Sequence, residues 1–145
     1  MFIVVDCEQV FGEISHSRLT SHVNLAKKSS VALNTGHTEA SQALSANLLD
    51  SILGEHLPKA AYKEVTRKKG SRLDIDEYEL QTALVLAPAW RAYARFWREE
   101  GDPIPYQFAR NASAHAVSRR QYSRVNAVIA LMLVASTLKL INEYL

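Results

Sequence analysis

Apolar side chains recur along most of this chain at every third or fourth position, the spacing of one face of an α-helix. Residues 14–34 and 38–54 each carry such a stripe, and Gly36 and Gly54 stand where these two helices would end. Pro58 fits the first turn of a short basic helix that follows. No segment alternates convincingly as a β-strand does. The pattern predicts an all-α fold.

The second half of the chain predicts three more helices. A long one over residues 78–97 contains Pro88, which removes one backbone hydrogen bond and should kink or split the helix. The sequence GDPIP at 101–105 is a clear break, and a short helix is expected over 106–117. Ser123 is placed to cap a last helix that runs to the C-terminus.

The last helix is apolar on nearly every side. A helix of this kind is buried all round, at the centre of a bundle, or also meets a second subunit. We therefore expect a helical bundle of five or six helices, with residues 1–145 forming one domain and residues 1–13 an N-terminal arm or strand. The apolar positions of the last helix are Val128, Ile129, Leu131, Met132, Leu133, Val134, Leu138, Leu140 and Ile141.

Composition adds little to this picture, but the distribution of charge adds more. The chain has 48% hydrophobic and 22% charged residues and a net charge of +2, ordinary values for a globular protein. Residues 103–142 contain no Asp or Glu, and residues 59–72 form a basic cluster relieved only by Glu64. Either region could present a positive face to phosphates, and either could be a solvated face balanced by acids elsewhere.

The chain carries no sign of secretion or membrane insertion. Cys7 is the single cysteine, so no disulfide can form within the chain. The start, MFIVVDCEQV, lacks the basic and long apolar regions of a signal peptide. The most apolar run, VIALMLVAS, is too short to span a bilayer. We expect a cytoplasmic protein that does not span the membrane.

Known metal and cofactor motifs are missing from the sequence. It has no glycine-rich phosphate loop, no HExxH and no GxSxG. His16, His22, His37, His56 and Cys7 are not at the spacings of zinc ligands. We therefore expect no metal and no cofactor, and we expect each of these histidines to lie at the surface or to cap a helix.

The stretch RNASAH, residues 110–115, combines an arginine and a histidine. An Arg–His pair at such a spacing is expected about once by chance in a chain of this composition, and Asn111 directly after Arg110 lowers that expectation roughly twentyfold. The stretch also opens the acid-free, arginine-rich region and precedes the apolar last helix.

With that helix, RNASAH resembles the R-N-x-x-x-H motif of the HEPN superfamily over about the last quarter of the chain. The resemblance implies a homodimeric, metal-independent endoribonuclease acting on RNA, in prokaryotic defence or beside an antitoxin protein. It places the site on Arg110, Asn111 and His115. Ala116 stands where a glycine often follows the histidine. The upstream acid that often accompanies the site cannot be assigned among Glu39, Glu64 and Glu77.

The residue types suit metal-free cleavage of RNA. A histidine can move protons at the ribose 2′-hydroxyl and the leaving oxygen, and an arginine can hold the phosphate. Asn111 could orient the histidine or bond the phosphate. On an ideal helix, however, Arg110 and His115 point about 140° apart and are separated by about 7.5 Å along the axis. A single copy would make a poor site, which favours two copies that combine their motifs across a two-fold axis.

Two other interpretations stay open. The chain could be a non-catalytic HEPN-like dimerisation or sensor domain. In a purely structural role, Arg110 could cap carbonyls or pair with an acid on the long helix, and His115 could be a satisfied interface histidine. The chain could also be a helical nucleic-acid-binding or adaptor protein that uses the basic clusters. Trp90 and Trp97 are expected to pack in the core because of their helical spacing. The nucleic-acid-binding candidates are Arg119, Arg120, Arg124 and, as a stacking residue, Tyr122.

Overall fold

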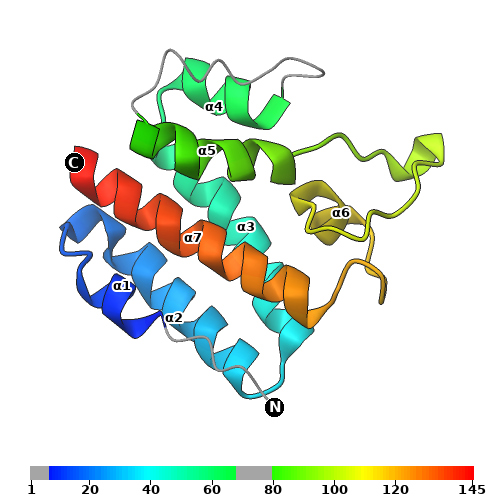
Figure 1. Cartoon of the computed structure of the whole chain (residues 1–145), viewed down its shortest axis with the longest axis horizontal. Helices are drawn as coiled ribbons and strands as arrows, with labels where there is room; N and C mark the ends of the chain where they lie inside the picture. The colour runs from blue at the N-terminus through cyan, green and yellow to red at the C-terminus, as the bar shows by residue number, and fades with distance from the viewer. Residues whose placement is uncertain (1–6, 68–79) are drawn as a thin grey trace.

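The computed structural model of the chain describes residues 7–67 and 80–145, and these form an all-α bundle without strands (Figure 1). The described residues contain seven α-helices, against the five or six expected, and five of them have seven or more residues. Their bounds are α1 Glu8–Gly12, α2 Thr20–Asn34, α3 Thr38–His56, α4 Lys59–Arg67, α5 Leu80–Ala92, α6 Arg110–His115 and α7 Arg124–Tyr144, with 3₁₀ turns η1 at Ser17–Leu19 and η3 at Arg98–Glu100.

The C-terminal helix α7 is the centre of the bundle. It packs against α1, α2, α3 and α5, and its fully buried side chains include Leu131, Val134 and Leu138. The hydroxyl of Ser123 accepts a hydrogen bond from the Asn126 N–H at 3.2 Å, so the predicted N-cap is confirmed. By length and composition α7 would suffice for a membrane span, but most of it is buried inside the bundle, as is usual for a core helix.

One side of α7 remains uncovered, so the expectation of burial all round is wrong for a single chain. Val125, Ile129 and Met132 are exposed at positions i, i+4 and i+7, which places them on one stripe. In Figure 1 this helix lies in front of α3, between α2 and α5, with no other helix over its near side. The alternative that α7 also meets a second subunit stays a prediction.

The N-terminal arm or strand expected over residues 1–13 is partly wrong. Residues 8–12 form the short helix α1, and Phe11 is buried in the core that α7 organises. Residues 1–6 lie outside the described part of the chain, as do residues 68–79, which include Glu77.

The long helix expected over 78–97 is shorter in the structure. Helix α5 continues through Pro88 without being split and ends at Ala92. The chain then leaves the helical path, and the Asp102 carboxylate accepts a hydrogen bond from the Trp97 N–H at 2.8 Å. Trp90 packs partly buried against the core, as predicted, but Trp97 is half exposed, so core packing is wrong for that residue.

The helix expected over 106–117 also begins later than its sequence pattern indicates. The fully buried Gln121 side chain donates to the carbonyls of Pro105 and Gln107, both at 3.0 Å. It also accepts a hydrogen bond from the Ala109 N–H at 3.0 Å. Because these backbone groups are bound by a side chain, the segment stays non-helical and α6 starts at Arg110.

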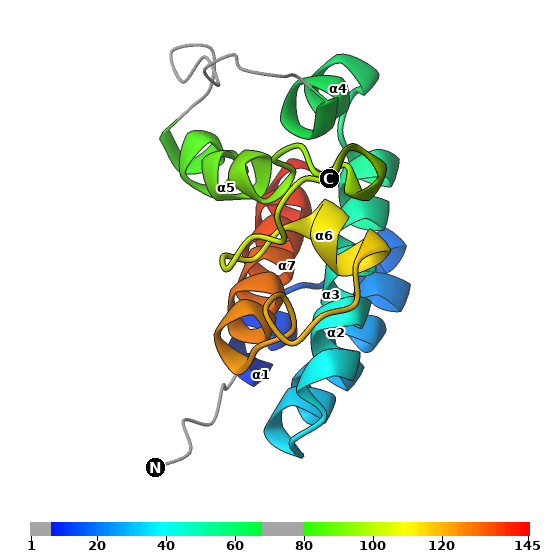
Figure 2. The same ribbon diagram turned by 90° about the vertical axis from the view of Figure 1, so that its right-hand side faces the viewer.

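A second set of hydrogen bonds joins α6 to α3. The Gln42 amide donates to the Ser113 hydroxyl and to the Gln121 carbonyl, both at 2.9 Å, and the Ser113 hydroxyl bonds Gln121 Oε1 at 3.2 Å. All three side chains are buried. Figure 2 shows α6 lying alongside α3, and this contact fixes where the residues of RNASAH point.

We expect Gln121→Ala to lower the free energy of unfolding by roughly 3 kcal/mol, because it leaves several buried backbone groups without partners. Urea denaturation followed by circular dichroism measures the change. The matched control is Gln107→Ala, whose side chain is exposed and whose effect should stay within about 0.5 kcal/mol. Equal stability of the two variants would contradict the role assigned to Gln121.

Candidate functional site

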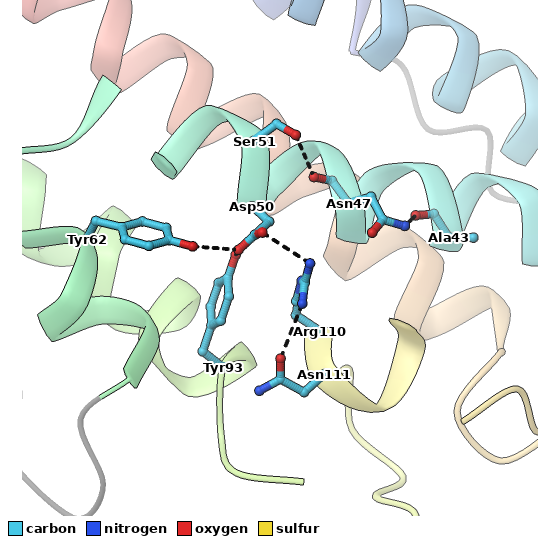
Figure 3. A network of polar contacts seen from close by, with 8 residues as sticks. All are labelled: Ala43, Asn47, Asp50, Ser51, Tyr62, Tyr93, Arg110 and Asn111. Carbon is cyan, nitrogen blue, oxygen red and sulfur yellow. Dashed lines mark hydrogen bonds and ion pairs between the residues drawn. The ribbon is translucent and has the colours of Figure 1, made fainter. Parts of the chain in front are cut away.

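Helix α6 begins with the arginine of RNASAH, and that side chain turns toward α3 (Figure 3). Arg110 Nη2 lies 3.1 Å from Asp50 Oδ2, forming an ion pair with hydrogen-bond geometry. The Arg110 side chain is 17% exposed and that of Asp50 is 31% exposed. Asp50 is on α3, the helix to which Ser113 is also bound.

Two tyrosines complete the surroundings of Asp50. The hydroxyls of Tyr93 and Tyr62 donate to Asp50 Oδ1 at 2.8 and 3.3 Å. Burial, and then the Asp50 carboxylate, raise the pKa of the Tyr93 hydroxyl far above its ordinary value, so this group stays protonated and donates. The Arg110 guanidinium carbon lies 5.9 Å from the centre of the Tyr93 ring, a cation–π contact. The Arg110 guanidinium is therefore held by its ion pair with Asp50 and by its contact with the Tyr93 ring.

Asn111 supports the same guanidinium from within α6. Arg110 Nη1 donates to Asn111 Oδ1 at 3.4 Å, a long hydrogen bond. The buried Arg110 Nε has no hydrogen-bond partner in the structure. Asp50 and Asn111 thus occupy two of the five N–H donors of the guanidinium, and the Nε–H donor is enclosed by the protein.

The histidine of RNASAH lies elsewhere. His115 is exposed at the end of α6, and together with Asn111 it lines an open groove of about 1730 Å³. The groove is also lined by Trp97 on one side and by Ile129 of α7 on another. Arg110 is not among the residues that line it. Within one chain Asn111 bonds Arg110 and lines the same groove as His115, whereas Arg110 and His115 face different surroundings.

Three of the candidate nucleic-acid-binding residues donate to backbone carbonyls. Exposed Arg120 donates to the Ile104 carbonyl at 3.4 Å, and the other two, Tyr122 and Arg124, are only partly exposed. The Tyr122 hydroxyl donates to the Ser113 carbonyl at 2.5 Å, and burial raises its pKa. Arg124 Nη1 donates to the Leu33 carbonyl at 3.1 Å, in the last turn of α2. Both side chains fasten helices together. Neither is presented freely to solvent, which weakens their case as RNA contacts.

The two exposed candidates are Arg119 and Arg120, which both lie on the surface of the turn before α7. The Arg120 guanidinium carbon lies 4.3 Å from the centre of the Tyr106 ring, which is itself largely exposed. An exposed ring with a cation on its face is a better stacking platform than Tyr122. Tyr106 was not among the predicted contacts, because it was expected to lie in the helix over residues 106–117.

Asp50 was also missed. It is the one acid in the apolar stretch 43–53, beside the buried Leu49, and a charge in such a place needs a partner. That signal was available in the sequence. Of the acids named in the sequence, Glu39 is exposed in the first turn of α3 and Glu64 lies on α4, so neither takes this position, and Glu77 lies outside the described residues.

A separate polar cluster lies between α2 and α3 and overturns part of the expectation for the histidines. His16 does cap η1, accepting from the Arg18 N–H at 3.4 Å. His22 and His56, however, are buried side chains that lie edge to face with ring centres 5.5 Å apart. Glu55 lies beside both rings. Burial, and then the nearby His22, lower the pKa of His56.

No protein-family model, curated protein or solved structure matches this chain. The resemblance of RNASAH to the HEPN superfamily therefore stays a prediction, and a function has to be argued from the residues of the site.

We expect Asp50→Asn to lower the free energy of unfolding by about 1–2 kcal/mol, because the partly buried Arg110 loses its counter-charge. Urea denaturation of Asp50→Asn, Arg110→Met and the double variant forms a double-mutant cycle. The coupling should reach about 1 kcal/mol. Glu39→Gln, an exposed acid on the same helix, is the control. Strictly additive effects of Asp50 and Arg110 would argue against the pair.

Proposed function

We propose that this chain is a metal-independent endoribonuclease of HEPN type that cleaves RNA at a site shared by two copies of the chain. The 2′-hydroxyl of a ribose attacks the adjacent phosphorus and displaces the 5′-oxygen, leaving a 2′,3′-cyclic phosphate and a 5′-hydroxyl. His115 moves the protons and Arg110 binds the phosphate oxygens. The setting in prokaryotic defence, with an antitoxin as inhibitor, rests on the resemblance alone.

The observation that carries the proposal is the contrast between the two motif residues. Arg110 is fixed by Asp50, Tyr93 and Asn111, an arrangement that pre-orients a guanidinium. His115 is exposed in a groove large enough for a nucleotide, with its ring accessible to substrate. A histidine that acts as acid or base needs such access, whereas a phosphate-binding group benefits from rigidity.

A second copy would supply what one chain lacks. Arg110 and His115 do not share a surface within one chain, so two-fold pairing would have to bring the histidine of one copy toward the arginine of the other. The exposed stripe of Val125, Ile129 and Met132 on α7 offers the apolar area for such contact. Ile129 also lines the groove that contains His115, so a dimer built on this stripe would form at the site.

A second candidate function is a non-catalytic dimerisation or sensor domain of the same type. The ion pair between Arg110 and Asp50 favours it, because this contact alone gives the arginine a structural role. Binding of RNA by a dimer that leaves the RNA intact would support this candidate.

We expect His115→Ala to reduce RNA cleavage at least about a hundredfold while leaving stability unchanged, because the side chain is exposed. The assay uses single-stranded RNA with EDTA present, at a temperature where the metal-free protein is folded, and identifies the product ends. The control is His37→Ala, another exposed histidine. Cleavage that persists in His115→Ala would refute the mechanism, as would products with 5′-phosphate ends.

We expect Met132→Glu to raise the dissociation constant of the dimer at least about tenfold, because a carboxylate would be buried in an apolar contact. Met132 is 58% exposed in the single chain, so the monomer should stay folded. Sedimentation equilibrium measures the constant, and Val31→Glu on the exposed side of α2 is the control. RNA cleavage should fall with the loss of dimer. A monomeric wild type with full activity would exclude a shared site.

A further inference from the structure

We propose that His22, Glu55 and His56 bind one divalent transition-metal ion, with zinc as the preferred ion. The three side chains come from the first turns of α2 and the last turn of α3. Each offers one ligand atom, and these three atoms all lie within 4.8 Å of one another. The spacing of 33 residues between His22 and Glu55 hides this arrangement in the sequence.

The distances fit a metal ion better than they fit direct hydrogen bonds. Glu55 Oε2 lies 3.4 Å from His22 Nε2 and 3.7 Å from His56 Nε2. Both separations exceed the usual range for N–H···O hydrogen bonds. In a tetrahedral zinc site, with metal–ligand bonds of roughly 2.0–2.1 Å, neighbouring ligand atoms are about 3.3 Å apart. Small side-chain rotations therefore suffice to place all three atoms around one ion.

The burial of the two histidines supplies an independent argument. The His56 side chain is 2% exposed, and neither of its ring nitrogens has a hydrogen-bond partner in the structure. His22 Nδ1 is likewise buried without one. Buried polar atoms are nearly always satisfied, so His56 Nε2, which is unpartnered and lies 3.7 Å from the Glu55 carboxylate, calls for a ligand. An ion bound at Nε2 of His56 would satisfy that atom.

The donor set selects the class of ion. Two imidazoles and one carboxylate suit zinc, cobalt, nickel or copper, whereas magnesium and calcium prefer oxygen ligands alone. Glu55 is 62% exposed, so an ion can enter from solvent and keep a water as its fourth ligand. Arg18 acts electrostatically on His56, but Arg18 is exposed and its charge is screened by solvent.

A metal ion at this site would link helices α2 and α3. It ties the start of α2 to the end of α3, and it lies apart from the Arg110 pair, which contacts α3 through Asp50. Its ligands take no part in the cleavage mechanism proposed above. Binding of zinc and cleavage of RNA can therefore be tested, and can fail, separately.

Isothermal titration calorimetry of the chelator-stripped full chain with ZnCl₂ tests the proposal. We expect one zinc per chain, no comparable binding of Mg²⁺, and an intense visible absorption when Co²⁺ is used instead, as four-coordinate cobalt gives. At a zinc concentration about a hundredfold above Kd, the melting temperature should rise by roughly 5–10 °C. Absence of stoichiometric binding would overturn the proposal.

Variants locate the ion. Glu55→Gln should weaken zinc binding at least about tenfold. Loss of a residue that only hydrogen-bonds a metal ligand already lowers metal affinity by about that factor, and Glu55 is itself a proposed ligand. Its exposed side chain makes this the variant that keeps the fold. His56→Gln should have the larger effect. Glu39→Gln and His37→Gln are the matched controls on exposed positions and should bind zinc as the wild type does. Unchanged binding in Glu55→Gln would overturn the site.

Discussion

The position of α6 depends on one buried side chain, the amide of Gln121. This group binds two carbonyls before α6, the N–H of Ala109 and the hydroxyl of Ser113. A helix of six residues cannot hold itself in water, since its few backbone bonds do not offset the cost of ordering the chain. Its placement has to come from tertiary contacts, and here they are mainly polar. The direction in which RNASAH presents its side chains follows from these hydrogen bonds.

Helix α3 supports three separate polar clusters of the molecule. Gln42 binds α6 and the following turn, Asp50 binds Arg110 and two tyrosines, and His56 meets His22 on α2. These residues lie along one 19-residue helix and face different neighbours. The apolar residues between them, such as Leu49 and Ile52, pack into the core.

The sequence pattern predicted the long apolar elements well and the polar contacts poorly. Helices α2, α3 and α7 follow from helical periodicity, and Ser123 was recognisable as a cap. The predicted start of α6 was wrong, because the Gln121 side chain from the turn after α6 binds the backbone of the segment that precedes α6. Asp50 and Gln121 take their roles from partners distant in the sequence, which periodicity does not report. The contact between His22 and His56 was not predicted for the same reason, because the two residues are far apart in the sequence.

The two residues that mark the RNASAH motif differ in what they contribute to the folded chain. Arg110 is part of the packing between α6 and α3, whereas His115 stands on the surface. Under the proposed function, a change at His115 would therefore remove the cleavage activity and leave the architecture intact, while a change at Arg110 would disturb both. A single substitution of the histidine would then turn the proposed enzyme into a binding domain. The arginine would then outlast the activity with which it is associated.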